Sequence, residues 1–269
     1  MDDLFTPGAL AGRTAFIAGG SSGINLGIAE RFATLGANLV LLARNQEKLD
    51  KAVAGLQAKG ARTQAVAADV RDFAAVSAAF AAAHTEFGDI DIVISGAAGN
   101  FLAPAVGLSA NGFKTVIDID LIGTFNVFRA AWDHVSKPGA SLIAISAGQA
   151  VHPQPFQAHA CAAKAGINML VKCLALEWGA AGVRVNAISP GPIDDTEGMA
   201  RLAPTPAATA ALKSRLALRD YGTKQDVADM AVFLGSSAAK YVTGSIFNVD
   251  GGNDLGDASA DALTPLQRG

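Results

Sequence analysis

Cysteine, tyrosine and tryptophan are scarce in this chain, which has two of each among 269 residues. The cysteines, Cys161 and Cys173, fall about three turns apart in a stretch with a helical pattern, too far for a disulfide if that helix is straight. This excludes a small disulfide-stapled scaffold and favours a reducing compartment. We expect both thiols to be small buried residues.

Charge is also scarce: charged residues make up 17% of the chain and the net charge is −3. A nucleic-acid-binding protein would usually show a basic face. We see no apolar run long enough to span a bilayer, no signal peptide at the start and no peroxisomal address in the last residues, Leu266 to Gly269. We therefore expect a cytoplasmic protein without nucleic-acid or membrane partners, and we assign no metal site.

Hydrophobic residues are plentiful, at 51%, and occur in short runs separated by helical patterns. The runs predict buried strands at residues 15–17, 38–43, 63–67, 90–95, 141–146, 183–188 and 245–249. Helical patterns lie at about 24–35, 46–59, 72–87, 109–135, 157–178 and 223–234, the last opening with a capping-box pair, Thr223 and Asp226. This alternation is typical of a single α/β domain over residues 1–269, a doubly wound parallel sheet with its ligand at the carboxyl ends of the strands. Residues 189–220, rich in proline and alanine, are irregular in pattern, and we expect them to form a lid.

A glycine-rich turn joins the first strand to the first helix, with the sequence Ala18-Gly19-Gly20-Ser21-Ser22-Gly23-Ile24-Asn25. Glycines at such a turn let backbone N–H groups approach a pyrophosphate, and the helix N-terminus favours its charge. We expect Gly19, Ser21, Ser22, Gly23 and Ile24 to contact a dinucleotide. The alternative is an ordinary strand-to-helix turn.

The ends of the next strands bear on the choice of cofactor. Arg44, with Asn45 beside it, ends the second strand, where a cation suits the 2′-phosphate of NADP, unless Arg44 only faces solvent. Asp69 follows the third strand, where its carboxylate is placed either to accept from the adenine amino group or to cap the next helix. Small residues after the fourth strand, Gly96 to Gly99, leave room for a cofactor, although a plain turn would look similar. The sequence favours NADP.

Together these features resemble the short-chain dehydrogenase/reductase family over nearly the whole chain. The matching segments are the glycine turn, Asp69-Val70, Ala97-Ala98-Gly99, Lys164, Arg184-Val185-Asn186 and Pro190-Gly191-Pro192-Ile193. The resemblance implies a nicotinamide cofactor, a sheet of about seven strands and a homotetramer built through the two long central helices. It places Val70, Ala97, Ala98 and Gly99 at the cofactor, Pro190, Gly191 and Ile193 at the nicotinamide, and Thr196 at the phosphates. One departure is Asn25, where the family has its third glycine, and we expect its side chain near the pyrophosphate.

The catalytic positions depart further from that family. The family's Lys is present as Lys164, but its Tyr is Ala160, its Ser is Ala147 and its Asn is Asp120. Ordinary carbonyl reduction is therefore disfavoured.

A narrower resemblance, to 2,4-dienoyl-CoA reductases of the peroxisomal type, accounts for these losses, because those enzymes also lack the Tyr and Ser. The matching segments are Ala97-Ala98-Gly99-Asn100-Phe101-Leu102, Asp118-Ile119-Asp120, Gly123-Thr124-Phe125-Asn126-Val127, His159-Ala160, Ala163-Lys164-Ala165, Glu177-Trp178-Gly179, Gly191-Pro192-Ile193 and Thr196-Glu197-Gly198. The resemblance implies hydride transfer from NADPH to the δ-carbon of a 2,4-dienoyl-CoA, with a 3-enoyl-CoA as product, in the degradation of unsaturated fatty acids.

The remaining residues suit that chemistry, which develops negative charge on a thioester oxygen. Lys164 can hold the nicotinamide ribose and supply positive potential. Asp120 is our candidate for ordering the water that protonates the α-carbon, unless it caps or pairs helices. The resemblance adds Asp250, although a structural role in its Asp-Gly-Gly turn is slightly favoured. We expect His159 to pack in the protein or at a subunit contact, and Asp118 to face elsewhere.

On the substrate side, Asn100 is expected at the acyl-CoA thioester, and Phe101, Leu102 and Phe156 can line an acyl slot. Arg201, Lys213, Arg215 and Arg219 in the lid can meet the phosphates of coenzyme A, although each can equally lie on a solvated helix face. Two other functions remain open. One is reduction of another conjugated enoyl or enone substrate, and the other is a catalytically silent NADP-binding scaffold.

Overall fold

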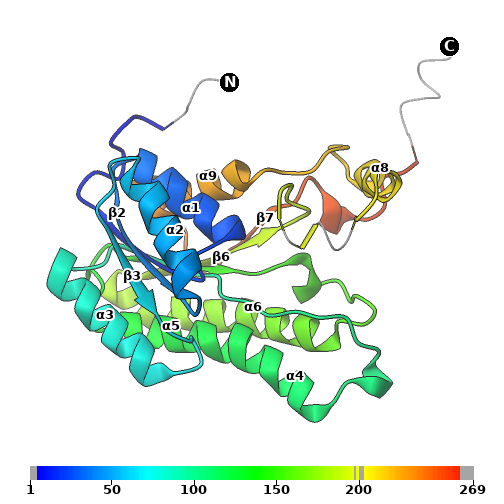
Figure 1. The fold of residues 1–269 in the computed structure, drawn as a ribbon, viewed down its shortest axis with the longest axis horizontal. Coiled ribbons are helices and arrows are strands. Elements are labelled where there is room, and N and C mark those ends of the chain that lie inside the picture. Colours follow the sequence, from blue (N-terminus) through cyan, green and yellow to red (C-terminus); the bar gives the residue numbers. More distant parts are fainter. Residues whose placement is uncertain (1–4, 197, 200–202, 261–269) are drawn as a thin grey trace.

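A seven-stranded parallel sheet forms the centre of the computed structural model, which describes residues 5–196, 198–199 and 203–260 (Figure 1). The strand order is β3-β2-β1-β4-β5-β6-β7, as the doubly wound prediction requires. The strands are β1 Thr14–Ala18, β2 Asn38–Ala43, β3 Thr63–Ala67, β4 Ile92–Ser95, β5 Ser141–Ile145, β6 Arg184–Pro190 and β7 Ile246–Val249. The helices are α1 Gly23–Thr34, α2 Gln46–Gln57, α3 Phe73–Phe87, α4 Ala110–Ile117, α5 Gly123–Ala131, α6 Ala158–Trp178, α8 Pro206–Arg215 and α9 Lys224–Gly235.

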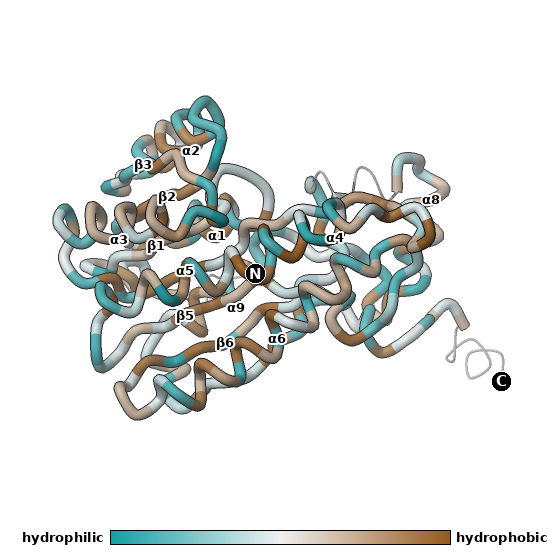
Figure 2. Tube along the Cα trace, turned by 90° about the horizontal axis from the view of Figure 1, so that it is seen from below, coloured by the Kyte–Doolittle hydropathy of each residue, from teal (hydrophilic) through white to brown (hydrophobic). Residues whose placement is uncertain are grey.

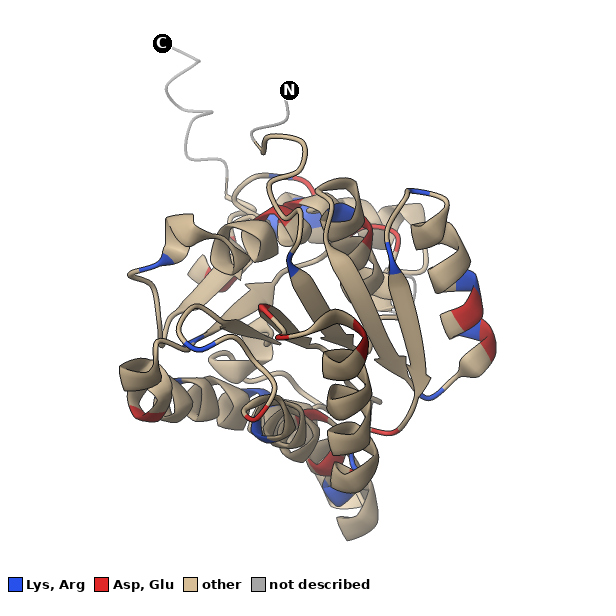
Figure 3. Cartoon of the chain, turned by 90° about the vertical axis from the view of Figure 1, so that its left-hand side faces the viewer, with Lys and Arg blue, Asp and Glu red and all other residues tan. Residues whose placement is uncertain are grey.

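Alternate residues of the strands supply two separate hydrophobic cores. In β1, Ala15 and Ile17 pack in the core under α1, α2 and α9, whereas Phe16 and Ala18 pack in the core under α3, α5 and α6. Because helices cover both faces, the strands are apolar throughout, which explains why short continuous apolar runs predicted them. Figure 2 shows the resulting contrast between brown strands and the teal outer turns of α2, and Figure 3 shows that charge lies mainly on helices and loops.

The helix expected over residues 109–135 is interrupted. Between α4 and α5, residues Asp118–Ile122 form a π-helical turn. The wider turn carries one extra residue, and such π turns often occur at functional sites. Asp120 within it is 1% exposed, whereas Asp118 stays near the surface in an ion pair with Lys114. The expectation that Asp118 faces elsewhere is confirmed.

The lid expected over residues 189–220 contains regular structure that the sequence reading missed. β6 extends to Pro190, and α8 begins after Thr205, whose hydroxyl accepts a hydrogen bond from the Ala208 amide. The proposed capping box is present: Thr223 and Asp226 cap α9 reciprocally.

The two cysteines are less buried than expected. Cys161 is half-buried and Cys173 is exposed, so the prediction that both thiols are buried is wrong; both are free. They lie on α6, where Met169 and Leu176 are also exposed. In the part of the chain that the structure describes, no helix is both long and apolar enough to cross a membrane.

Candidate active site

The glycine turn lies at the carboxyl end of β1 and leads directly into α1. Gly19 and Gly23 have φ angles of 80° and 60°, in the left-handed region that favours glycine. Ser22 occupies the N-cap position of α1 without making a side-chain capping bond. The first amides of α1 are thus available to an anion, and Ser21, Ser22, Gly23 and Ile24 surround them. This geometry fits the pyrophosphate of a dinucleotide.

The side chain of Asn25, expected near the pyrophosphate, lies between the glycine turn and the loop after β4. It is buried, and its Nδ2 donates to the carbonyl oxygens of Gly96, at 2.8 Å, and Gly19, at 3.3 Å. A residue on the first turn of α1 therefore ties the glycine turn to the loop after β4. The direction of a side chain within a turn is not readable from sequence spacing.

At the adenosine end, two arginines flank one carboxylate. Arg71 donates to Asp69 with an Nη2–Oδ2 distance of 2.6 Å, and this hydrogen bond, with the nearby charge of Arg44, lowers the pKa of Asp69. The alternative role of Asp69 as a helix cap is wrong, because Asp72 caps α3. Arg71 was missed: it lies two residues beyond Asp69, outside the segments that carried the resemblance.

The neighbouring cofactor candidates take different positions. Arg44 is exposed at the end of β2, as a 2′-phosphate ligand must be, while the side chain of Asn45 caps α2 by accepting from the Lys48 amide. Val70 is buried and packs against Gly123, where a Cβ would collide with it. Val70 is therefore positioned by α5, and its backbone follows Asp69 at the same edge of the sheet.

The floor of the site is a buried acid–base pair, Asp120 and Lys164. The Oδ2 atom of Asp120 lies 3.4 Å from Nζ of Lys164, and its Oδ1 accepts from the Gly99 amide at 2.8 Å. Nζ of Lys164 also donates to the Ile145 carbonyl at the end of β5, at 2.9 Å. Burial is the largest effect on Asp120 and raises the pKa of its carboxyl, against the charge of Lys164, which lowers it. The fold thus brings together a π turn, the loop after β4 and α6 around one carboxylate.

The family's hydroxyl positions leave no donor here. Ala160 is buried against Val116 and Ala163, and Ala147 follows β5. The hydroxyl of Ser146, one residue earlier, donates to the side chain of Asn168 on α6 at 2.6 Å. The floor offers a carboxyl and an ammonium group instead of a phenol.

Asp250 closes the other side of the site through its own turn. Its two carboxylate oxygens accept from the amides of Gly252, at 2.9 Å, and Asp254, at 2.8 Å. Its backbone packs so closely on Gly191 that a Cβ there would lie 2.5 Å from its Cα. This contact supports the structural role for Asp250 and places it against the segment expected at the nicotinamide.

The segment from Pro190 to Thr196 is held in place by the sheet and by its own hydrogen bonds. Pro190 pairs with Val249 in the sheet, Ile193 is buried and bridges to Gly222, and the Thr196 hydroxyl donates to the Ile193 carbonyl. The backbone from Pro190 to Thr196 therefore forms a wall that runs from β6 towards α8.

The expected acyl slot lies where two loops meet. The Ala103 amide donates to the Phe156 carbonyl at 2.9 Å, and Asn100 donates to Gln157 at 2.6 Å. Phe101 is 43% exposed, and Leu102 and Phe156 are more exposed still. Ala97 and Ala98 begin the first of these loops.

His159 lies behind this slot. Its ring is fully buried and packs at 4.5 Å from the ring of Phe101, as the packing expectation requires. Among the described residues, neither ring nitrogen has a hydrogen-bond partner. Its electrostatic effect on Asp120 lowers the pKa of that carboxyl and is the smallest of the effects there, burial being the largest.

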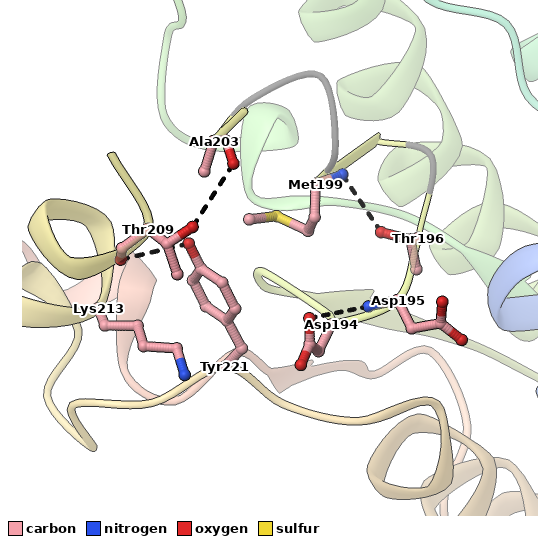
Figure 4. A pocket seen from close by; sticks show the side chains of 8 residues that line it. All are labelled: Asp194, Asp195, Thr196, Met199, Ala203, Thr209, Lys213 and Tyr221. Atoms are coloured by element: carbon pink, nitrogen blue, oxygen red, sulfur yellow. Dashed lines mark hydrogen bonds between the residues drawn. The ribbon is translucent and has the colours of Figure 1, made fainter. Parts of the chain in front are cut away.

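Beside the wall lies a cavity of about 480 Å³ between the loop after β6 and α8 (Figure 4). It is lined by Asp194, Asp195, Thr196, Met199, Ala203, Thr209, Lys213 and Tyr221. Of the lid cations, Lys213 pairs with Asp220, Arg215 pairs with Asp257 and Arg219 donates to the Ser214 carbonyl. Arg201 lies outside the described residues. Of the described lid cations, Lys213 lines this cavity, and the described residues contain no cluster of three or more metal-binding side chains.

Comparison with known proteins identifies relatives along the whole fold. A family model described as enoyl-(acyl carrier protein) reductase matches residues 18–254. The peroxisomal 2,4-dienoyl-CoA reductase of Danio rerio, named as (3E)-enoyl-CoA-producing, is 42% identical over 95% of this chain and 86% of its own. A probable 2,4-dienoyl-CoA reductase of Bacillus subtilis, named as (2E)-enoyl-CoA-producing, is 37% identical over 90% of this chain and 97% of its own. Among solved structures, a citronellol catabolism dehydrogenase of Pseudomonas aeruginosa PAO1 is 33% identical, with a TM-score of 0.81 over 94% of this chain and 100% of its own.

Proposed function

Since this chain belongs to the short-chain dehydrogenase/reductase family and is an oxidoreductase, we propose that it reduces a 2,4-dienoyl-CoA to a 3-enoyl-CoA with NADPH. The observation that carries the proposal is the buried Asp120–Lys164 pair, in a floor where the family's Tyr and Ser are alanines. The relatives named 2,4-dienoyl-CoA reductases support it.

The cofactor would lie across the carboxyl ends of the strands. Amides at Gly19 and from Ser21 to Ile24 would hold the pyrophosphate, Arg44 the 2′-phosphate, with Asn45 beside it, and Asp69 with Val70 the adenine. Ala97, Ala98 and Gly99 would border its ribose, and Pro190, Gly191, Ile193 and Thr196 would fix the nicotinamide and phosphates. NADPH supplies the hydride that reaches the δ-carbon. The two arginines around Asp69 favour NADP over NAD, because an added phosphate meets positive charge there.

Proton delivery to the α-carbon is assigned to Asp120. Hydride addition leaves a dienolate, whose charge rests on the thioester oxygen and whose α-carbon must take a proton. Lys164 would hold the nicotinamide ribose and supply positive potential next to that charge. Asp120, with its pKa raised by burial, would pass a proton through an ordered water and regain one from solvent. A positioned proton donor of this kind contributes about 10²- to 10⁴-fold in rate.

Asp250 would help to hold the same water from the opposite side. Both of its oxygens already accept one amide hydrogen each, and a carboxylate oxygen can accept a second. Because its carboxylate mainly stabilises the turn, we expect Asp250 to contribute less to the rate than Asp120.

The acyl-CoA substrate would enter between the loops and the lid. Phe101, Leu102 and Phe156 offer exposed apolar surface for the acyl chain, and Asn100 lies beside them for the thioester. Lys213 is the lid cation whose side chain borders the cavity, which makes it our candidate for a coenzyme A phosphate.

Oligomeric state and compartment complete the proposal. Phe125 on α5, and Met169 and Leu176 on α6, are 42%, 60% and 87% exposed, which supports a homotetramer packed through these helices. We keep the cytoplasm as the proposed compartment, although the name of the Danio rerio relative says peroxisomal. Light scattering on the purified protein and imaging of the tagged protein in its own cell test these two points.

The test of the reaction is NADPH oxidation with three thioesters: a 2,4-dienoyl-CoA, a 2-enoyl-CoA and a 3-ketoacyl-CoA. We expect turnover of the dienoyl thioester alone. Equal turnover of the 2-enoyl-CoA would contradict the proposed substrate class. Tight NADPH binding without turnover of any of the three would contradict the proposed reaction and favour the silent scaffold. Repeating the assay with NADH and with Arg44→Ala tests the cofactor, because loss of one charged hydrogen bond should raise the KM for NADPH about 10- to 100-fold and leave NADH unaffected.

A further inference from the structure

Asn25 is a buried polar residue whose side chain spans two loops. It is 8% exposed and belongs to α1, yet its amide reaches the carbonyl oxygens of Gly19 and Gly96. These two glycines are 77 positions apart in the chain, since 96 − 19 = 77. We call the three residues the Asn25 bridge.

The bridge lies where the sheet ends. Ala18 of β1 pairs with Ser95 of β4, and the Gly96 amide still donates to the Ala18 carbonyl at 3.1 Å. Past this point the two strands diverge: β1 leads into the glycine turn, and β4 leads into the loop from Ala97 to Gly99. The Asn25 amide joins their carbonyls there, so a side chain supplies the next link between two neighbouring strands.

The space around the bridge leaves no room for a side chain at either glycine. A Cβ on Gly96 would collide with the Oδ1, Nδ2 and Cγ atoms of Asn25. A Cβ on Gly19 would lie 2.8 Å from the Ala97 amide nitrogen and 3.0 Å from Nδ2 of Asn25. The asparagine at 25 and the glycine at 96 are therefore one steric unit.

The orientation of the amide is fixed as well. Two carbonyl oxygens require the donor end, Nδ2, to face them, and among the described residues Oδ1 has no partner. A buried acceptor without a partner lowers stability. We therefore attribute the role of Asn25 to the two hydrogen bonds that its Nδ2 donates.

We propose that Asn25 is a positioning residue for the dinucleotide, and that the Asn25 bridge sets the separation between the two loops that would enclose it. The inference rests on the proposed cofactor site, because Gly19 and Ala97, which the bridge holds together, both belong to that site. Without the bridge the loops would separate more freely, and binding NADPH would require them to be ordered first.

Two changes at position 25 test the bridge. Asn25→Asp keeps the size but replaces the donor with an oxygen facing two carbonyls, and Asn25→Gly removes the side chain. We expect both to raise the Kd for NADPH, Asn25→Gly about tenfold and Asn25→Asp more. Intrinsic fluorescence or calorimetry measures this Kd without turnover. Hydrogen exchange should speed up at Gly19, Gly20 and Ala97 in both variants, and the KM for the dienoyl-CoA should stay unchanged.

A matched control is Asn186→Asp. Asn186 is another buried asparagine, and its Nδ2 donates to the Val242 carbonyl at 3.0 Å. It lies near the amino end of β6, whereas the candidate cofactor site lies at the carboxyl ends of the strands. We expect it to lower Tm without changing the Kd for NADPH. If Asn25→Asp and Asn25→Gly bind NADPH as the parent does, the inference is wrong. If the parent itself does not bind NADPH, the proposed cofactor fails instead.

A double variant tests the steric unit. Gly96→Ala should lose NADPH affinity or fold poorly, because its Cβ meets Asn25. Adding Asn25→Gly should restore folding and bring the Kd back to that of Asn25→Gly alone. A double variant as defective as Gly96→Ala would contradict the bridge.

Discussion

On the floor of the site, Asp120 and Lys164 lie 3.4 Å apart and are almost fully buried, whereas in the lid Lys213 and Asp220 form a pair that water reaches. Burial raises the pKa of Asp120, while the hydrogen bond from Lys213 lowers the pKa of Asp220. The same two side-chain types thus behave oppositely, because only the floor removes solvent from the carboxyl group. This difference is the reason why we propose the chemistry at the floor and substrate binding at the lid.

The largest expected effect is at the floor. Asp120→Asn keeps the acceptor for the Gly99 amide but cannot pass a proton, so kcat should fall about 10²- to 10⁴-fold. The KM for NADPH should change little. Steady-state kinetics measures both. Asp118→Asn, two residues away in an exposed ion pair, is the control and should keep parental turnover. Normal turnover by Asp120→Asn would remove the floor from the mechanism.

The pH dependence sharpens the same contrast. A raised pKa means that Asp120 holds its proton to a higher pH than a free carboxyl, whose value is 3.8. The proton-donating form is present below the raised pKa and is lost as pH rises through it. We therefore expect kcat of the parent to fall along this limb and Asp120→Asn to lack it. The same linkage makes unfolding easier as pH rises through this range, because the folded state binds the proton more tightly than the unfolded chain.

Substitution of Asp250 should reduce kcat less than a substitution at the floor and more than one in the lid. Asp250→Asn replaces one of two oxygens that accept backbone amides, so the free energy of unfolding should fall by about 1–3 kcal/mol. Its kcat should fall less than that of Asp120→Asn. Denaturant unfolding and kinetics on one preparation separate the two effects. A loss of kcat equal to that of Asp120→Asn, without loss of stability, would make Asp250 an equal partner in the chemistry.

The smallest expected effect is in the lid. Lys213→Ala should raise the KM for the acyl-CoA about two- to fivefold and leave kcat unchanged, because an exposed ionic contact is weak and is screened by salt. Lys51→Ala, which breaks an exposed pair with Glu47 on α2, is the matched control and should leave KM unchanged. A kcat defect in Lys213→Ala as large as that at Asp120 would remove the distinction between floor and lid.

The sheet was predictable because its physical signal is local. Asn38–Ala43 and Thr63–Ala67 have the predicted bounds, since an apolar run between turns suffices to define a buried strand. The cap at Thr223 was likewise readable from one residue pair. The spacing of Lys164 from Ala160 located the candidate floor, and in the structure Asp120 lies 3.4 Å from Lys164.

The features that were not predicted from the sequence depend on the direction of a side chain or on contacts with residues distant in the chain. The extra residue of the π turn that turns Asp120 inward leaves no mark in a spacing of apolar residues. The inward direction of Asn25 depends on Gly96, and the exposure of Cys173 depends on what covers α6. Helix α8 is an exception, because Thr205 and Pro206 at its start are a common opening for a helix and mark it in the sequence.

The most direct measurement of the central claim is the position of label in the product. The parent enzyme is given a 2,4-dienoyl-CoA and NADPH carrying deuterium at the transferable position, and the product is analysed by NMR and mass spectrometry. The account predicts a 3-enoyl-CoA with one deuterium on the δ-carbon, and in deuterated water a second on the α-carbon. A 2-enoyl-CoA with the solvent deuterium on the γ-carbon, or label at the β-carbon, would contradict the α-protonation assigned to Asp120.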